Sequence, residues 1–165
     1  MSPKTVVIAG ATRGIGLELA KQYTNAGWQV IARILLARLK AVEPHKIVIY
    51  DALDDTTITL AVEQLEGMAI DLLINSMGVH TFDTLETASS AEMQQLFVLN
   101  AVSPFLLPRA LLPNLKRAAE TNGFAIIANM SSMGGSIELA GLPRPVAGSV
   151  YAYRASKASL NMLHR

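Results

Sequence analysis

The sequence predicts an α/β fold in which a parallel β-sheet is buried between layers of helices. Two observations support this prediction. Short apolar runs rich in Val and Ile alternate along the chain with longer segments of helical period. That alternation is typical of β-α-β units, whose crossover helices cover both faces of the sheet. We find no internal repeat, linker or low-complexity segment in the sequence.

Five apolar runs fit strands, and longer amphipathic segments fit the helices between them. The predicted strands are residues 5–9, 28–32, 46–50, 70–75 and 124–129. The predicted helices are residues 14–26 with Gly27 as C-cap, 35–42, 55–67, a long helix from Ser90, and 151–165. Pro104, Pro108 and Pro113 should kink the long helix or end it early, because each removes an amide donor.

Composition limits the classes of function. The 165 residues, 51% hydrophobic and 16% charged, suffice for one core, so we expect a single domain over 1–165. A net charge of +1 without a basic run argues against nucleic acid as a partner. The absence of cysteine excludes disulfides, thiolate metal sites and a Cys nucleophile, and the three histidines show no ligand spacing, so no metal is expected. The N-terminus lacks a signal-peptide core, and the apolar runs are too short to span a bilayer, which favours a cytoplasmic protein without membrane contact.

A glycine-rich loop follows the first predicted strand. Residues 10–16 read Gly-Ala-Thr-Arg-Gly-Ile-Gly and lead into an amphipathic helix. Glycines allow a tight turn and close approach of backbone amides to a pyrophosphate, which the positive end of the helix also attracts. The alternative interpretation is an ordinary strand-to-helix turn.

With this loop the chain resembles the short-chain dehydrogenase/reductase family, whose fingerprint is TGxxxGIG, with Ala9 in place of the Thr. The resemblance implies a Rossmann-type, three-layer, doubly wound parallel sheet that binds NAD or NADP. It assigns cofactor contacts to the loop residues Gly10, Thr12, Arg13, Gly14, Ile15 and Gly16.

The end of the second strand indicates which cofactor is preferred. It reads Ile31-Ala32-Arg33, without the carboxylate that would favour NAD in this family. Arg33 and Arg13 suit a ribose 2′-phosphate, because Arg offers it bidentate donors, so NADP is expected, with NAD possible. The alternative is that both arginines are solvated surface charges. Asp51 matches the family's Asp that faces the adenine, with Ala52 beside it, although Asp51 also fits a helix-flanking acid.

A phenol and an ammonium lie four residues apart, at Tyr153 and Lys157, and therefore on one face of the last helix. A nearby cation stabilises phenolate, which lets the phenol exchange a proton with a carbonyl or alcohol oxygen near neutral pH. Tyr151 lacks such a partner, because Ala155 lies four residues beyond it. The same spacing also occurs by chance on structural helices.

Three further motifs match the family in its order along the chain. After the fifth strand, Ser131-Ser132 matches "NISS", so Ser132 is expected to hold the substrate oxygen and Ser131 to cap the backbone. Asn75-Ser76-Met77-Gly78 replaces "NNAG", and Asn75 and Gly78 keep its cofactor-side contacts. Asn100 matches the long-helix Asn that supports a water next to the Lys.

Together the motifs imply an oxidoreductase that reduces a carbonyl to an alcohol with NADPH, or the reverse, through Ser132, Tyr153, Lys157 and Asn100. In this assignment Tyr153 and Lys157 also contact the cofactor. The longer loop between Ser132 and Tyr153 resembles the carbonyl-reductase-like and C-factor-like branch. The family fold continues beyond the Tyr/Lys helix, so we expect a truncated enzyme whose fifth strand is an open edge; a degenerate binding module without turnover is the alternative. The resemblance also implies a homodimer or homotetramer.

Overall fold

The structure is a computed structural model that describes residues 3–34, 44–141 and 150–163. The predicted helix 35–42 and His164 lie outside the described residues. The chain divides into two compact units. The sheet unit contains Met1–Met77 and Leu107–Met130, and the helical unit contains Gly78–Leu106 and Ser131–Arg165. The expectation of a single domain stays a prediction, and each unit is described by itself.

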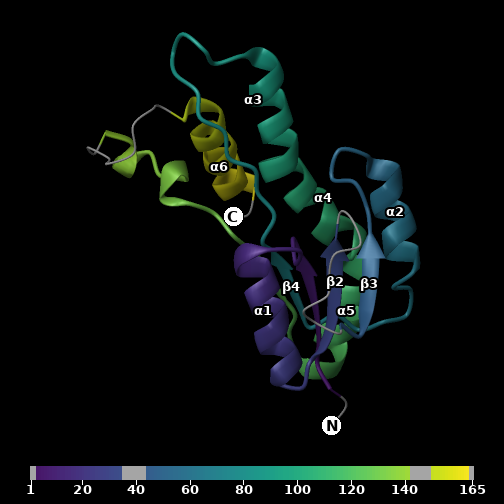
Figure 1. The fold of residues 1–165 in the computed structure, drawn as a ribbon. Coiled ribbons are helices and arrows are strands. Elements are labelled where there is room, and N and C mark those ends of the chain that lie inside the picture. Colours follow the sequence, from purple (N-terminus) through teal and green to yellow (C-terminus); the bar gives the residue numbers. More distant parts are fainter. Residues whose placement is uncertain (1–2, 35–43, 142–149, 164–165) are drawn as a thin grey trace. The chain divides into compact units, whose positions relative to one another are not determined.

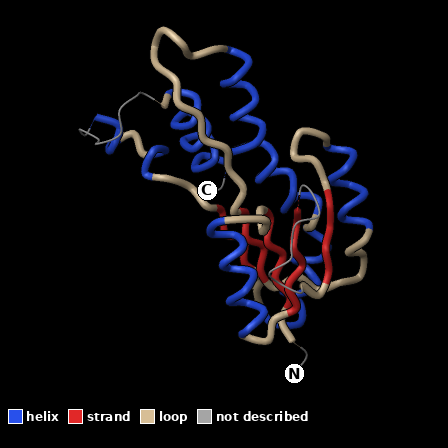
Figure 2. The backbone as a smooth tube through the Cα atoms, in the orientation of Figure 1, coloured by secondary structure: helices blue, strands red, loops and turns tan. Residues whose placement is uncertain are grey.

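The sheet unit contains the predicted parallel sheet, drawn as red strands in Figure 2. Its five strands run in the order β3-β2-β1-β4-β5, and all neighbouring pairs are parallel. They are β1 (Thr5–Ala9), β2 (Gln29–Ile34), β3 (Lys46–Ile49), β4 (Leu72–Asn75) and β5 (Ile126–Asn129). The order reverses between β1 and β4, which is where open α/β sheets bind their ligands. The predicted fold class is confirmed.

Strand ends depend on pairing, and here the structure differs from the sequence prediction. β2 extends to Ile34 because Arg33 and Ile34 pair with Val48 and Ile49 of β3. β4 begins at Leu72 and not at residue 70, because the amide of Ile70 instead donates to the carbonyl of Asn114. Likewise β5 begins at Ile126, two residues later than predicted.

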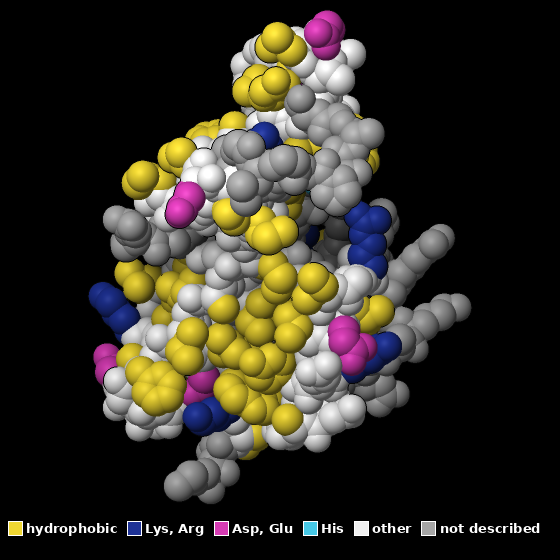
Figure 3. All heavy atoms as spheres, turned by 90° about the vertical axis from the view of Figure 1, so that its left-hand side faces the viewer, with side chains coloured by type: hydrophobic (Ala, Val, Ile, Leu, Met, Phe, Trp, Pro, Cys, Tyr) yellow, Lys and Arg dark blue, Asp and Glu magenta, His cyan; other side chains and the backbone are white. Residues whose placement is uncertain are grey.

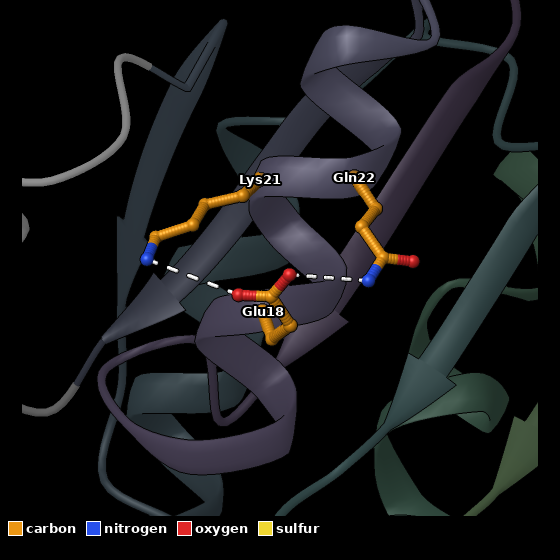
Figure 4. A network of polar contacts seen from close by, with 3 residues as sticks. All are labelled: Glu18, Lys21 and Gln22. Atoms are coloured by element: carbon orange, nitrogen blue, oxygen red, sulfur yellow. Dashed lines mark hydrogen bonds and ion pairs between the residues drawn. The ribbon is translucent and has the colours of Figure 1, made fainter.

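One face of the sheet is covered by α1 (Gly14–Asn25), as Figure 1 shows. Beneath it, Val6, Ile8, Val30 and Ala32 are fully buried or nearly so. The helix ends at the predicted place, since Gly27 adopts a φ of +78° just beyond it. Its outer face carries an exposed network in which Glu18 accepts from Gln22 at 3.1 Å and pairs with Lys21 at 3.9 Å (Figure 4).

The opposite face of the sheet is covered by α5 (Leu112–Asn122), with α2 (Asp55–Glu63) beside β3 (Figure 1). Asn114 of α5 is buried and donates to the carbonyls of Leu65 and Met68 at 2.6 and 2.8 Å, which fixes the turn after α2. That turn replaces the last residues of the predicted helix 55–67.

The long helix predicted from Ser90 is divided by its prolines. It consists of α3 (Ser90–Phe97), a π-helical segment (Val98–Val102), α4 (Ser103–Ala110) and α5. Pro104 has no N–H to donate to the carbonyl of Asn100, so the α-helical ladder cannot continue through this turn. The chain leaves the helix at Leu111, just before Pro113.

Within the described residues no single helix is long and apolar enough to cross a membrane. The bent pair formed by Ser90–Ala110 and Leu112–Asn122 meets the length and composition requirement only as a pair.

The strand β5 is an open edge of the described sheet, as predicted. Phe124, Ile126 and Ile127 are 55%, 48% and 44% exposed. Hydrophobic side chains gather on this side of the molecule in Figure 3. An apolar strand with one open edge of this kind can pair with a further strand or with another chain.

The helical unit packs α3 against α6 (Tyr151–Leu163). Two short 3-10 turns, Met133–Gly135 and Glu138–Gly141, precede α6 along the chain. Residues 78–89 form an irregular segment before α3, drawn as loop in Figure 2. The last predicted helix, residues 151–165, corresponds to α6 and is present over its described residues, Tyr151–Leu163.

Candidate active site

Two positions of the glycine loop, Gly10 and Gly16, lie so close to other backbone atoms that a side chain would not fit. A Cβ on Gly16 would stand 2.2 Å from the carbonyl oxygen of Gly10, so residue 16 has no room for a side chain. Gly10 has a φ of +93°, and a Cβ there would stand 3.0 Å from the amide nitrogen of Met77. The loop after β1 is thus held tightly against the end of β4.

The N-terminus of α1 is open to a ligand. Arg13 is the N-cap residue, but its side chain makes no capping hydrogen bond. Thr12 is half-buried, whereas Arg13, Gly14 and Ile15 are exposed. Uncapped amides at the positive end of a helix attract an anion such as a phosphate.

Arg33 is buried, with 7% of its surface exposed, so its interpretation as a solvated surface charge is wrong. Its guanidinium donates to the carbonyl of Tyr50 at 2.7 Å and to the thioether of Met77 at 2.8 Å. The group also lies 4.3 Å from the centre of the Tyr50 ring. Among the described residues, the buried Nε of Arg33 has no hydrogen-bond partner.

Burial dominates the electrostatics of this pair. Desolvation lowers the pKa of Arg33, while Tyr50 and Asp51 oppose that shift. Desolvation raises the pKa of Tyr50 to about 12, so the phenol is neutral and stacks as an uncharged ring against the cation.

Asp51 lies in the turn after β3 and is exposed. Its carboxylate accepts from the amide of Leu53 at 2.9 Å, which is an Asx turn and agrees with the helix-flanking interpretation. The neighbouring Ala52 is buried. The adenine-facing role of Asp51 stays a prediction.

Asn75 ends β4 and is buried. Its amide donates to the side-chain oxygen of Asn129, the paired residue of β5, at 2.6 Å. Its carbonyl accepts from the amide of Met130. Asn75 therefore joins the carboxyl ends of two strands.

In the helical unit, Lys157 and Asn100 lie together at Gly78. Lys157 is only 3% exposed and Asn100 is fully buried. The Lys157 Nζ and the Asn100 Oδ1 lie 3.5 and 3.6 Å from the position that a Cβ of Gly78 would take. Burial lowers the pKa of Lys157, because desolvation disfavours the ammonium.

Ser132 and Tyr153 also lie together, at Gly134. The Ser132 Oγ and the Tyr153 Cε1 lie 3.3 and 3.4 Å from the position that a Cβ of Gly134 would take. The Ser132 Oγ accepts from the amide of Gly134 at 3.0 Å. Since the hydroxyl oxygen is the acceptor there, its O–H can donate to a substrate oxygen.

The backbone cap expected at Ser131 is made by Ser132 instead. Ser131 was expected to cap the backbone, and this is wrong, because its hydroxyl instead bonds Asn161 of α6 at 2.5 Å. Ser132 is the cap of the Met133–Gly135 turn. The physical reason is that α6 approaches closely here: a Cβ on Gly135 would stand 2.8 Å from the backbone of Lys157.

Asn100 connects the loop after Gly78 to α6. Its side chain accepts from the amide of Val79 and donates to the carbonyl of Val79, both at 2.8 Å. It also donates to the Ser156 hydroxyl at 3.0 Å, which in turn donates to the carbonyl of Tyr153 at 2.7 Å. This polar network ties the loop to the helical turn that carries Tyr153.

Four residues of these clusters were not predicted from sequence. They are Tyr50, Met77, His80 and Ser156. Each lies within two residues of a predicted site residue: Tyr50 of Asp51, Met77 and His80 of Gly78, and Ser156 of Lys157. Closeness to these motifs in the sequence is the property that could have identified them. His80 lies in a loop and packs against Tyr153.

The depressed pKa of Lys157 predicts how stability changes with pH. Because the folded pKa lies below the ordinary 10.5, the unfolded chain binds more protons between these two values. The free energy of unfolding should therefore rise as the pH increases from the lowered pKa of the folded chain to 10.5. Urea unfolding of wild type and Lys157→Met at several pH values between 7 and 10 tests this: the free energy of unfolding of wild type should rise relative to that of the variant toward high pH. An unchanging difference would contradict it.

Comparisons with known proteins identify the family to which the chain belongs. A family model described as "short chain dehydrogenase" matches residues 4–165. Protein FixR of Bradyrhizobium diazoefficiens is 31% identical over 182 residues, covering 99% of this chain and 60% of that protein. Retinol dehydrogenase 8 of Bos taurus is 29% identical over 146 residues, covering 81% of this chain and 47% of that protein.

Among solved structures, an NADPH-bound carbonyl reductase from chicken fatty liver has a TM-score of 0.88 and 31% identity. The match covers 99% of this chain and 69% of that one. The chain thus spans about half to two-thirds of the length of these relatives. The matched family model, the sheet order and the glycine loop agree: the chain belongs to the short-chain dehydrogenase family.

Proposed function

We propose that this chain carries the dinucleotide site and the proton-transfer groups of an NADPH-dependent reductase that converts a carbonyl to an alcohol, or the reverse. The observation that carries this proposal is the grouping of Ser132 with Tyr153 at Gly134, and of Lys157 with Asn100 at Gly78. These are the polar groups needed to bind a carbonyl oxygen and protonate it.

The sheet unit supplies the dinucleotide site in this proposal. The glycine loop has the close backbone approach that a pyrophosphate requires, and the α1 amides have no side-chain cap. Gly10, Gly14 and Gly16 would hold the pyrophosphate, Asp51 and Ala52 the adenine, and Asn75 the nicotinamide half. Gly78, a residue of the helical unit, is a further cofactor contact in this proposal. The bound dinucleotide would supply the hydride.

The helical unit supplies the proton. The Ser132 O–H donates to the substrate oxygen and orients it, and the Tyr153 phenol delivers a proton to the same oxygen. The Lys157 ammonium lies one helical turn beyond Tyr153, where its charge stabilises the phenolate that remains. Asn100 holds the loop beside them and supports the water that returns a proton.

NADPH is the cofactor that the arginines favour. The Nε of Arg33, which has no partner within 3–34, 44–141 and 150–163, and the exposed Arg13 offer donors to a 2′-phosphate, whereas no carboxylate ends β2 to bind a free ribose hydroxyl. The chicken carbonyl reductase, which is similar in fold, was solved with NADPH bound.

The choice between cofactors is directly testable. Arg33→Ala should weaken NADPH binding about 10- to 100-fold, the range for a lost charge-assisted hydrogen bond, and leave NADH binding nearly unchanged. Titration with each dinucleotide, followed by fluorescence of Trp28 and the nicotinamide, measures both affinities. Lys21→Ala is the matched control, because it removes an exposed positive charge from the outer face of α1. Equal losses for NADPH and NADH would contradict the assignment of Arg33.

Turnover is tested by adding aldehydes and ketones to the NADPH-bound chain and following nicotinamide absorbance. NADPH oxidation that depends on Tyr153 supports a reductase. Binding without turnover favours the second candidate, a dinucleotide-binding module.

We further propose that the chain acts in the cytoplasm and uses a small-molecule substrate.

We also propose that the chain assembles as a homodimer or homotetramer through α3 and α6. Between α3 and α6 lies a mainly apolar pocket of about 240 Å³ lined by Met93, Phe97 and Ala155. Phe97 and Met93 are 44% and 40% exposed, so this helix pair offers apolar surface to a second subunit.

A further inference from the structure

Residues 79–83, here called the His80 loop, are fixed to α6 at both ends. At one end, Asn100 holds the backbone of Val79 by two hydrogen bonds and reaches α6 through Ser156. At the other end, the carboxylate of Asp83 accepts from the amide of Ala152 at 3.0 Å, and Asp83 is only 2% exposed. The segment between these two anchors therefore has a defined position against the first turn of α6.

Two aromatic rings of this loop are stacked in series onto Tyr153. The His80 ring centre lies 4.6 Å from that of Tyr153, tilted by 55°. The Phe82 ring lies 4.7 Å from His80 in an edge-to-face arrangement at 71°. Both distances fall in the range for attractive aromatic pairs.

The Tyr153 ring also contacts the Met133–Gly135 turn. The Tyr153 Cε1 lies 3.4 Å from the position of a Gly134 Cβ, so this glycine admits the ring closely. Tyr153 is half-buried. Its ring therefore has two close contacts, with the His80 ring and with the turn at Gly134.

We propose that His80 is a positioning residue for Tyr153: its imidazole packs on the phenol and holds the ring in the orientation from which the hydroxyl reaches the substrate oxygen. The kinetic part of this inference rests on the proposed function, but the ring contact does not. The loop anchors, made by Asn100 and Asp83, fix His80 in turn. Asn100 thus acts on Tyr153 from two directions, through the His80 loop and through Ser156.

The contact is tested by NMR without any turnover. Wild type, His80→Ala and His80→Phe are compared, because Phe keeps a ring of similar size and Ala removes it. Three-bond couplings should report one χ1 rotamer of Tyr153 in wild type and His80→Phe, and averaging in His80→Ala. The His80 ring protons should also show a ring-current shift that persists in Tyr153→Phe and vanishes in Tyr153→Ala. Absence of that shift, or an unchanged Tyr153 rotamer in His80→Ala, overturns the inference.

The kinetic consequence is measured with NADPH and an aldehyde. His80→Ala should lower kcat about three- to tenfold, the range for one aromatic pair, with NADPH binding unchanged, and His80→Phe should restore it. A merely structural role would not give rescue by Phe together with unchanged binding. If wild type turns over and His80→Ala equals it, the inference fails while the proposed function stands. If wild type does not turn over but the NMR contact and rotamer change are present, the proposed function fails while the positioning stands.

Discussion

Tyr153→Phe should lower kcat for carbonyl reduction by about 100- to 10,000-fold, the usual contribution of a general acid, and leave the affinity for NADPH unchanged. The substitution removes only the phenol oxygen. The ring that packs against His80 and Gly134 is kept, so the local structure should be preserved. Steady-state NADPH oxidation and fluorescence titration give the two numbers.

Tyr151→Phe is the matched control for this experiment. It makes the same change on the same helix, two residues earlier, at a side chain that is 41% exposed and has Ala155 one turn beyond it. Its kcat should equal that of wild type. Substantial activity in Tyr153→Phe would remove Tyr153 from the role of acid, and lost NADPH binding in that variant would show that the tyrosine serves the fold or the cofactor instead.

Gly16→Ala should have the second large effect, on both stability and cofactor binding. The new methyl would stand 2.2 Å from the carbonyl oxygen of Gly10, which is backbone and cannot move aside without opening the loop. The free energy of unfolding should fall by about 3 kcal/mol, the upper end for overpacking. NADPH binding should weaken by about tenfold or more, equal to about 1.4 kcal/mol. Urea unfolding and fluorescence titration measure the two effects.

Gly67→Ala separates this clash from a general effect of removing a glycine. Gly67 has a φ of +76°, and a Cβ there would meet nothing within 4 Å. The variant should lose about 1–2 kcal/mol of stability through backbone strain and keep its NADPH affinity. A Gly16→Ala variant that binds NADPH as tightly as Gly67→Ala does would show that the glycine loop is an ordinary turn.

The fold class, the order of the elements and the identity of the motifs could all be predicted from the amino-acid sequence. Periodicity located all five strands, because parallel strands covered by helices must be apolar along their length. The glycine pattern located the loop after β1, because only glycine fits where Gly10 and Gly16 meet. Proline positions predicted the breaks in the helix from Ser90, because a missing N–H is a local property of the residue.

Tertiary structure decided what depends on neighbours distant in sequence. β2 reaches Ile34 because β3 pairs with it, and the buried place of Arg33 depends on Tyr50 and Met77, which come from two other strand ends. The bond of Ser131 to Asn161, which leaves the backbone cap to Ser132, depends on how closely α6 approaches Gly135. His80 could not be connected with Tyr153 from sequence, because 72 intervening positions separate them and only the anchors at Asn100 and Asp83 bring the rings together. Local rules specify which residues can turn, pair or ionise, whereas packing specifies which of them meet.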